Sequence, residues 1–170
     1  MTDPRMGDAL WEAIERLPRG SGIVFRHYEL ARADRALLFA RVAKIARRRN
    51  LLIVRAGHPA GRGEDGVHGG RSIRPGLRTA SVHNRREAVA AVRGGADAIF
   101  VSPIFATRSH PLARTLGPVR LGLMIHGLKL PIIALGGIDA RMARGLPGIY
   151  GWAGIDAWTA PDQKRKAVPI

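Results

Sequence analysis

Short apolar runs alternate along the chain with stretches of helical periodicity, and this alternation constrains the fold more than any other feature. Seven runs are typical of strands: residues 22–28, 51–54, 66–68, 79–83, 98–101, 132–135 and 155–159. Between most of them, apolar residues recur at helical spacing, as Leu38, Val42 and Ile45 do. Strands that alternate with helices pair in parallel through right-handed crossovers. We therefore predict an α/β fold, either a shortened (β/α)8 barrel or an open doubly wound sheet.

The segment 131–139 is the most specific piece of this pattern. Its apolar residues 132–135 predict a buried strand, and Gly136 and Gly137 follow at once. Asp139 is placed to cap a short helix. A glycine turn at the carboxyl end of a parallel strand is a common place for a phosphate group, which the backbone N–H groups bind. An ordinary tight turn between strand and helix is the alternative.

Length and composition indicate one globular domain. The chain has 170 residues, of which 46% are hydrophobic and 24% charged. We expect a single domain over residues 1–162, followed by a basic tail over 163–170. No apolar run approaches the roughly 18 residues that a membrane span needs, and no signal-peptide pattern opens the chain. With no cysteine, a disulfide framework is excluded, and we expect a cytoplasmic protein without a membrane partner.

The charge of the chain is strongly positive. It has 28 Lys+Arg against 13 Asp+Glu, a formal net charge of +15, which favours anionic partners. Phosphate ligands and nucleic acid are both anionic, but only 5% of the residues are aromatic, so stacking surfaces for bases are scarce. We therefore predict a phosphorylated ligand rather than a nucleic-acid partner.

Several segments together resemble one known family. They read GIVFR at 22–26, DGVH at 65–68, ASVH at 80–83 with EA at 87–88, ADAIFVSPIFAT at 96–107, and IIALGGI at 132–138. In this order they resemble motifs of thiamine phosphate synthases and the related TenI-type thiazole tautomerases. The family fold is a TIM (β/α)8 barrel, so the resemblance favours the barrel over the open sheet.

The resemblance also bears on the number of strands. Family members begin with a strand that ends in a turn similar to Thr2, Asp3 and Pro4. It therefore predicts that this chain lacks most of the first barrel strand. Open strand edges would then favour self-association.

The resemblance implies a reaction and a cofactor. The synthase joins a pyrimidine diphosphate to a thiazole phosphate and releases pyrophosphate, with Mg²⁺ on the diphosphate. Arg26 matches a diphosphate-binding arginine, whereas Tyr28 stands where the family has lysine. The positions of the family's metal carboxylates fall near Arg55 and Ala56 and in the region 72–73. Mg²⁺ is thus expected for the synthase reaction, but its ligands are replaced, and we assign no metal-binding residue.

The residues that the family uses to bind the thiazole phosphate are matched better than its metal carboxylates. The predicted substrate- and phosphate-binding residues are Arg26, Ser81, Thr107, Gly136, Gly137 and Thr159. Thr159 is predicted to end the last strand and add a hydroxyl beside the glycine turn. In the loop after Thr107, His110 stands where the family has lysine.

His83 is the candidate catalytic residue. It matches the position at which the tautomerases carry their acid/base histidine, and imidazoles titrate near neutral pH, which suits proton transfer. A histidine with a structural hydrogen bond is the alternative. Three functions stay open: a thiamine phosphate synthase-like protein, a metal-independent thiazole tautomerase, and a non-catalytic homologue that binds a phosphorylated ligand.

Overall fold

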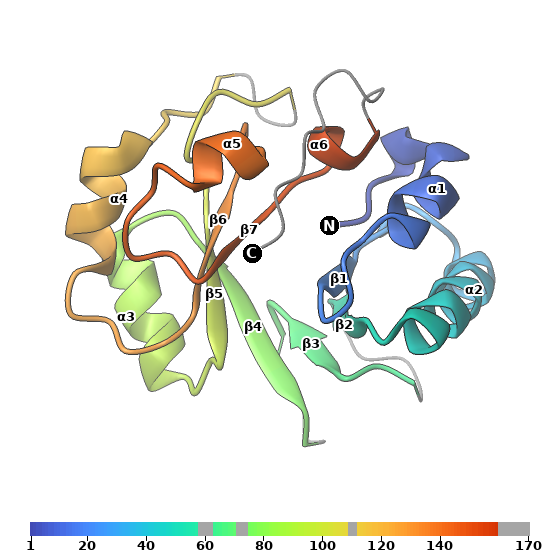
Figure 1. Ribbon diagram of the computed structural model, residues 1–170. Coiled ribbons are helices and arrows are strands. Elements are labelled where there is room, and N and C mark those ends of the chain that lie inside the picture. Colours follow the sequence, from blue (N-terminus) through green and yellow to red (C-terminus); the bar gives the residue numbers. More distant parts are fainter. Residues whose placement is uncertain (58–62, 71–74, 109–111, 160–170) are drawn as a thin grey trace. The chain divides into compact units, whose positions relative to one another are not determined.

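Strands and helices alternate along most of the part of the chain that the structure describes, except that β2, β3 and β4 follow one another with no described helix between them (Figure 1). The structure is a computed structural model that describes residues 1–57, 63–70, 75–108 and 112–159. The chain divides into two compact units, residues 1–78 and 79–170. The described residues form seven strands, six of them where the sequence predicts them. The predicted α/β fold is confirmed, the single domain over 1–162 stays a prediction, and the basic tail lies outside the described residues.

Unit 1 carries three parallel strands. Its elements are η1 (Pro4–Met6), α1 (Ala9–Glu15), β1 (Gly22–Phe25), α2 (Arg32–Arg49), β2 (Leu52–Ala56) and β3 (Gly66–His68). Strand β2 lies between β1 and β3. In the register of these pairs Phe25 lies beside Arg55, and Ala56 lies beside His68.

Helix α2 covers one face of the unit 1 sheet. Phe39 and Val42 of α2 are buried, and the Phe39 ring meets the Phe25 ring edge-on at 5.3 Å between centroids. Because side chains alternate between the two faces of a strand, Arg55 shares this helix-covered face with Phe25. Ala56 and His68 therefore belong to the opposite face.

Unit 2 carries the other strands. Its elements are β4 (Leu77–Val82), which begins at the end of unit 1, α3 (Arg85–Arg93), β5 (Ala98–Val101), α4 (Gly117–Ile125), β6 (Ile132–Leu135), α5 (Ala140–Ala143), β7 (Gly151–Ala153) and α6 (Asp156–Thr159). Each of the pairs β4–β5, β5–β6 and β6–β7 is parallel. Figure 1 shows α3 and α4 along one side of β4 and β5.

The unit 2 core lies between this sheet and its helices. Val82, Val101 and Ala134 of the strands are buried against Leu121 and Met124 of α4. By alternation, the residues directly before and after each of these strand positions point to the opposite face. Ser81 and His83 are therefore on the face that the helices leave uncovered, and both are exposed.

One local prediction is wrong. The last strand is β7 at Gly151–Ala153, and the segment that was predicted to be this strand, 155–159, contains the helix α6 instead. This error has a physical cause, since Asp156 in the first turn of α6 favours a helix start.

Two further observations concern the start of the chain and membranes. The Thr2 N–H donates to the Val24 carbonyl at 2.9 Å, so the first residues run beside β1. That most of a first barrel strand is lacking stays a prediction.

Among the described residues no helix has both the length and the apolar character required to cross a bilayer.

Candidate functional site

His83 directly follows β4, and its imidazole is held by the next strand end. Its Nδ1 lies 2.8 Å from the Ser102 carbonyl oxygen and 3.4 Å from the Ser102 hydroxyl. A carbonyl oxygen only accepts, so Nδ1 carries the hydrogen in this bond. The neutral ring then has its lone pair on Nε2, which is the form that a proton acceptor needs.

The backbone at His83 is fixed by the start of α3. Asn84 caps α3, its Oδ1 accepting the Glu87 N–H at 2.9 Å. The Glu87 carboxylate accepts the His83 N–H at 2.7 Å. These bonds satisfy N–H groups that the helix start leaves without partners. They also hold His83 at the exposed edge of unit 2.

The glycine turn after β6 has the backbone that glycine permits. Gly136 has φ +94° and Gly137 has φ +60°, and Asp139 caps α5 by accepting the Met142 N–H at 2.9 Å. Among the described residues none accepts a hydrogen bond from the Gly137 N–H. That an anion binds to this donor stays a prediction.

The loop after β5 packs closely on this turn. The Ile104 and Phe105 N–H groups donate to the carbonyls of Leu135 and Gly136 at 2.9 and 3.0 Å. A Cβ at Gly137 would overlap the Ala106 carbonyl oxygen and lie 2.9 Å from the Phe105 oxygen. Close backbone packing is thus one reason for glycine at 137. It also brings the half-buried Thr107, which follows Ala106, to the same edge as the turn.

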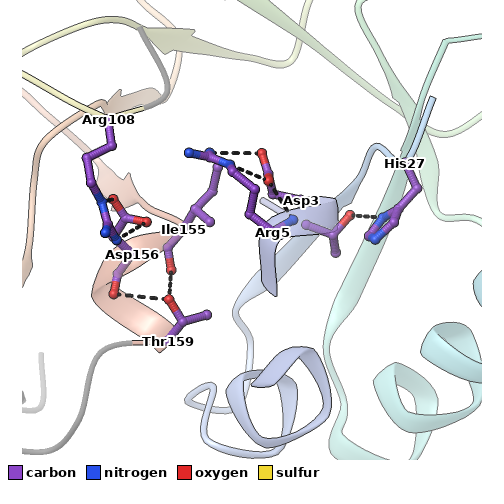
Figure 2. A network of polar contacts seen from close by, with 8 residues as sticks. Asp3, Arg5, His27, Arg108, Ile155, Asp156 and Thr159 are labelled. Atoms are coloured by element: carbon purple, nitrogen blue, oxygen red, sulfur yellow. Dashed lines mark hydrogen bonds and ion pairs between the residues drawn. The ribbon is translucent and has the colours of Figure 1, made fainter. Parts of the chain in front are cut away.

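Arg108 and Thr159 are engaged within unit 2. The Arg108 guanidinium binds Asp156 of α6 through two bonds, Nε to Oδ2 at 3.1 Å and Nη2 to Oδ1 at 3.0 Å (Figure 2). Thr159 lies in α6, not at a strand end, so that part of the prediction is wrong. Its hydroxyl lies 3.4 Å from the Ile155 and Asp156 carbonyls, which are the partners of a helical threonine (Figure 2). Ser109 and His110 lie outside the described residues.

A second group of polar residues follows the strands of unit 1. Arg26 directly follows the end of β1 at Phe25, and Ala56 at the end of β2 pairs with His68 at the end of β3. Arg35 binds the carbonyls of both Arg26 and Ala56. We call Arg26, Ala56 and His68 the carboxyl-end row. Arg26 is half-buried, and Ala56 and His68 are buried. The row lies on the face that α2 does not cover.

The backbone of Arg26 is held from two sides. Its N–H donates to the Thr2 hydroxyl oxygen at 3.0 Å, and the same oxygen lies 3.0 Å from Nδ1 of His27. Its carbonyl accepts two bonds from Arg35 of α2, at 3.0 and 2.9 Å. His27 has φ +40°, an uncommon conformation for a residue other than glycine, and it stacks on Phe25 with centroids 5.2 Å apart.

Both histidines of this region are neutral at pH 7. Burial, and then the charge of Arg26, lowers the pKa of His68 to about 4. Burial also lowers the pKa of His27 below its ordinary value. Arg26 therefore supplies positive charge to the row, while His68 offers a neutral hydrogen-bonding group.

Comparison with known proteins finds the same family. The family model described as "Thiamine monophosphate synthase" matches residues 74–157. About half of the chain is therefore similar to this family. The resemblance predicted from the motifs is thereby confirmed. The matched segment includes His83, Thr107 and the Gly136–Gly137 turn.

Relatives with that name are similar over part of the chain. The thiamine-phosphate synthase of Chloroflexus aurantiacus is 37% identical over 116 residues, 61% of this chain and 54% of that protein. The enzyme of Geobacillus thermodenitrificans is 36% identical over 124 residues, 62% of this chain and 55% of that protein. The chain thus spans about half the length of these relatives.

A solved structure shows the likeness of the fold. Thiamine phosphate pyrophosphorylase from Pyrococcus furiosus matches with a TM-score of 0.75 over 95% of this chain and 87% of that one. The sequence identity is 23%, so this match concerns the fold alone. It supports the TIM-type α/β fold over the open doubly wound sheet.

The described residues of this chain do not fit the magnesium ion that the resemblance implies. Mg²⁺ is bound through carboxylates and waters in octahedral geometry. On the carboxyl-end row Ala56 offers only a methyl group, and Arg55 lies on the other face, its guanidinium carbon 3.4 Å above the Phe39 ring. Its Nη2 binds Glu64 at 3.3 Å. Among the described residues no group of three His, Cys, Asp or Glu side chains could hold a metal ion.

The sequence alone did not identify three residues that contribute to these sites. Arg35 and Thr2 hold the Arg26 backbone, and Asp156 binds Arg108. Each contact joins residues that are at least 9 positions apart. Composition and periodicity carry no signal for such contacts, and only the resemblance of Thr2 to a family turn pointed to one of them.

Proposed function

We propose that the chain acts in thiamine biosynthesis as a thiamine phosphate synthase-like protein whose unit 2 binds a phosphorylated thiazole. The observation that carries this proposal is the Gly136–Gly137 turn. Both glycines adopt positive φ, the Gly137 N–H has no acceptor among the described residues, and the turn lies inside the family match. A phosphate group would accept hydrogen bonds from such N–H groups. The hydroxyl of Thr107, at the same edge, is a further candidate contact.

The experiment is a titration of the ¹⁵N-labelled chain with thiazole phosphate, followed by amide NMR spectra. We expect the Gly136 and Gly137 signals to shift and saturate, because their N–H groups would bind the phosphate. Gly122 of α4 and Gly145 serve as matched controls in the same spectrum. The unphosphorylated thiazole should bind at least about tenfold more weakly, since charge-assisted bonds would be lost. Unshifted Gly136 and Gly137 signals at saturation would exclude the turn as the phosphate site.

Whether the bound ligand reacts is a separate question. A synthase joins the pyrimidine carbon to the thiazole nitrogen as the bond from that carbon to the diphosphate breaks and pyrophosphate leaves. Formation of thiamine phosphate that depends on Mg²⁺ would support this activity. The absence of fitting carboxylates among the described residues argues against the metal-dependent form of the reaction.

Metal-independent thiazole tautomerisation is the second candidate function, and His83 favours it. The bond from His83 to the Ser102 carbonyl leaves Nε2 as the proton acceptor. Tautomerisation would require removal of one proton from the thiazole phosphate and its return at another atom, without a metal. We expect His83→Ala to abolish isomerisation in the presence of EDTA. His126→Ala is the control, because His126 is an exposed histidine at the end of α4.

A non-catalytic role would give a different pattern. Saturable shifts of Gly136 and Gly137 without turnover, with or without Mg²⁺, would indicate a homologue that binds its ligand only. The three candidates thus differ in metal dependence and in the effect of His83→Ala.

A further inference from the structure

The outer face of α4 is apolar although it faces solvent. Val119 and Leu123 lie four positions apart, on the side of the helix opposite the buried Leu121 and Met124, and they are 76% and 70% exposed. Among the described helices only α4 carries two large hydrophobic side chains that are exposed. We infer that Val119 and Leu123, which we call the α4 patch, form the contact through which two copies of the chain make a weak, symmetric dimer. This inference does not depend on the proposed function.

Two arginines bind the backbone at the two ends of α4. Arg120, the single charged residue of this helix, donates from Nη1 to the Thr115 carbonyl just before the helix begins, at 3.4 Å. Arg85 of α3 donates from Nη1 to the Met124 and His126 carbonyls at 2.7 and 2.8 Å, at the end where a cation suits the helix dipole. Both guanidinium groups therefore bind the ends of α4, and the patch between these ends is formed by uncharged residues.

An exposed leucine of α2 shows the contrast with the α4 patch. Leu37 is 67% exposed, close to the value of Leu123, but eight of the 18 residues of α2 are charged. Asp34 and Arg41 lie three and four positions from Leu37 and therefore neighbour it on the helix surface. A single apolar side chain among charges is ordinary for a protein surface, whereas an apolar patch is typical of an interaction site.

The charge of the chain indicates which partner fits the α4 patch. With a formal net charge of +15, two copies repel each other wherever basic residues meet. At the α4 patch they can approach without bringing like charges into contact. An acidic partner would instead be attracted to basic surfaces, such as the arginines 47–49 at the end of α2. A surface that meets its own copy about a twofold axis closes after two subunits, so the assembly is a dimer.

The size of the α4 patch limits the strength of the contact. Helix α4 has nine residues and is therefore roughly 14 Å long. One face of such a helix offers much less than the area of about 800 Å² that each partner contributes to a standard interface. Contacts of this size are transient. We therefore expect a dimer Kd on the order of 100 µM.

The test is sedimentation velocity of the full chain over about 5 to 500 µM. We expect the weight-average mass to rise with concentration toward twice the monomer mass and not beyond it. Leu123→Glu should raise the dimer Kd at least about tenfold, because a carboxylate would be buried against an apolar surface. Leu37→Glu is the matched control and should keep the Kd within about twofold of that of the original chain.

The comparison of these two variants is matched in charge. Both lower the net charge by the same amount, so the difference between their Kd values depends on the position alone. Circular dichroism and urea unfolding establish that both variants are folded. A monomer at all concentrations, or equal changes in both variants, would overturn the inference.

Cross-linking tests the contact without a change of charge. The chain has no cysteine, so a single thiol can be placed on the α4 patch by Leu123→Cys and on α2 by Leu37→Cys. A short bismaleimide adds one thiol to each of its two rings and so joins cysteines that come close together. Covalent dimers of Leu123→Cys should form at least about fivefold faster than those of Leu37→Cys, because the dimer raises the effective concentration of the thiol. Equal rates would show that the two α4 patches do not meet.

The salt dependence distinguishes a second copy from other occupants of the patch. Two chains of the same net charge repel less when salt screens them, so the dimer Kd should fall as NaCl is raised from about 20 to 500 mM. Association through an anion that bridges two chains would weaken with salt, and that result would overturn the inference. Association that persists unchanged in Leu123→Glu and Val119→Glu would place the contact elsewhere, for example at an open strand edge, and would equally overturn it.

Discussion

The guanidinium of Arg35 donates two hydrogen bonds to the carbonyl oxygen of Arg26, from Nε at 3.0 Å and from Nη2 at 2.9 Å. A third bond reaches the Ala56 carbonyl at 2.7 Å. The same cation lies over the rings of Phe25 and Tyr28, 5.5 and 5.6 Å from their centroids. One side chain of α2 thus fixes the ends of β1 and β2, and it orients the residue that we expect to bind the diphosphate.

Arg35→Ala is expected to lower the free energy of unfolding by about 2–3 kcal/mol. The reason is that two strand-end carbonyls lose charge-assisted hydrogen bonds. Arg35→Lys should recover less than half of this, because a single ammonium cannot bind both carbonyls as a planar fork does. Urea unfolding measures both variants. Arg32→Ala, one turn earlier on the exposed surface of α2, is the control and should lie within about 0.5 kcal/mol of the original chain.

The buried Arg55–Glu64 pair predicts a non-additive double mutant. Glu64→Met or Arg55→Met alone should cost about 3–5 kcal/mol of stability, since each leaves one charge buried without its partner. The Arg55 Nε and Glu64 Oε1 atoms already have no hydrogen-bond partner in the described structure. The Arg55→Met, Glu64→Met double mutant should therefore be more stable than either single mutant. Additive losses in urea unfolding would show that the two charges are not coupled.

The sequence was sufficient for the parts of the fold that depend on local patterns. Residues 98–101 and 132–135 are uninterrupted apolar runs, and both form strands with those bounds. Asp139 was predicted as a cap because its side chain reaches an N–H group only three residues away. In each case the information lies within one turn or one strand.

The wrong prediction of the last strand concerns a region whose secondary structure depends on tertiary contacts. Residues 151–153 form a strand because they pair with β6, although Gly151 makes the segment a poor strand former by itself. Trp158 was assigned to that strand, but in α6 its ring stacks on Trp152 at 5.3 Å between centroids. In the candidate site, too, local features could be predicted from the sequence and tertiary contacts could not. The glycine turn was visible in the sequence, whereas the supports of Arg26 come from Thr2 and Arg35 in other elements.

Gly137→Ala is expected to destabilise unit 2 by about 2–4 kcal/mol. The new Cβ would overlap the Ala106 carbonyl oxygen, and the residue would have to keep φ +60°, which alanine disfavours. Gly122→Ala is the matched control, because Gly122 lies in α4 and a Cβ there meets nothing within 4 Å. That variant should gain up to about 1 kcal/mol from helix propensity. Thermal and urea unfolding compare the two. Equal stability of Gly137→Ala and the original chain would mean that the loop at Phe105 and Ala106 yields without cost.

His68 is expected to make stability fall as the pH is lowered from 6.5 to about 4. Burial and the nearby Arg26 lower the pKa of His68 from 6.5 to about 4, so in this window the unfolded chain binds a proton that the folded chain does not. The contribution is fully present above pH 6.5, and about 3 kcal/mol of it is lost at pH 4. Urea unfolding between pH 4 and 8 measures it. His68→Gln should flatten this part of the profile, whereas His126→Gln, at an exposed site, should keep the slope of the original chain. Parallel profiles for His68→Gln and the original chain would show that folding does not lower the pKa of His68.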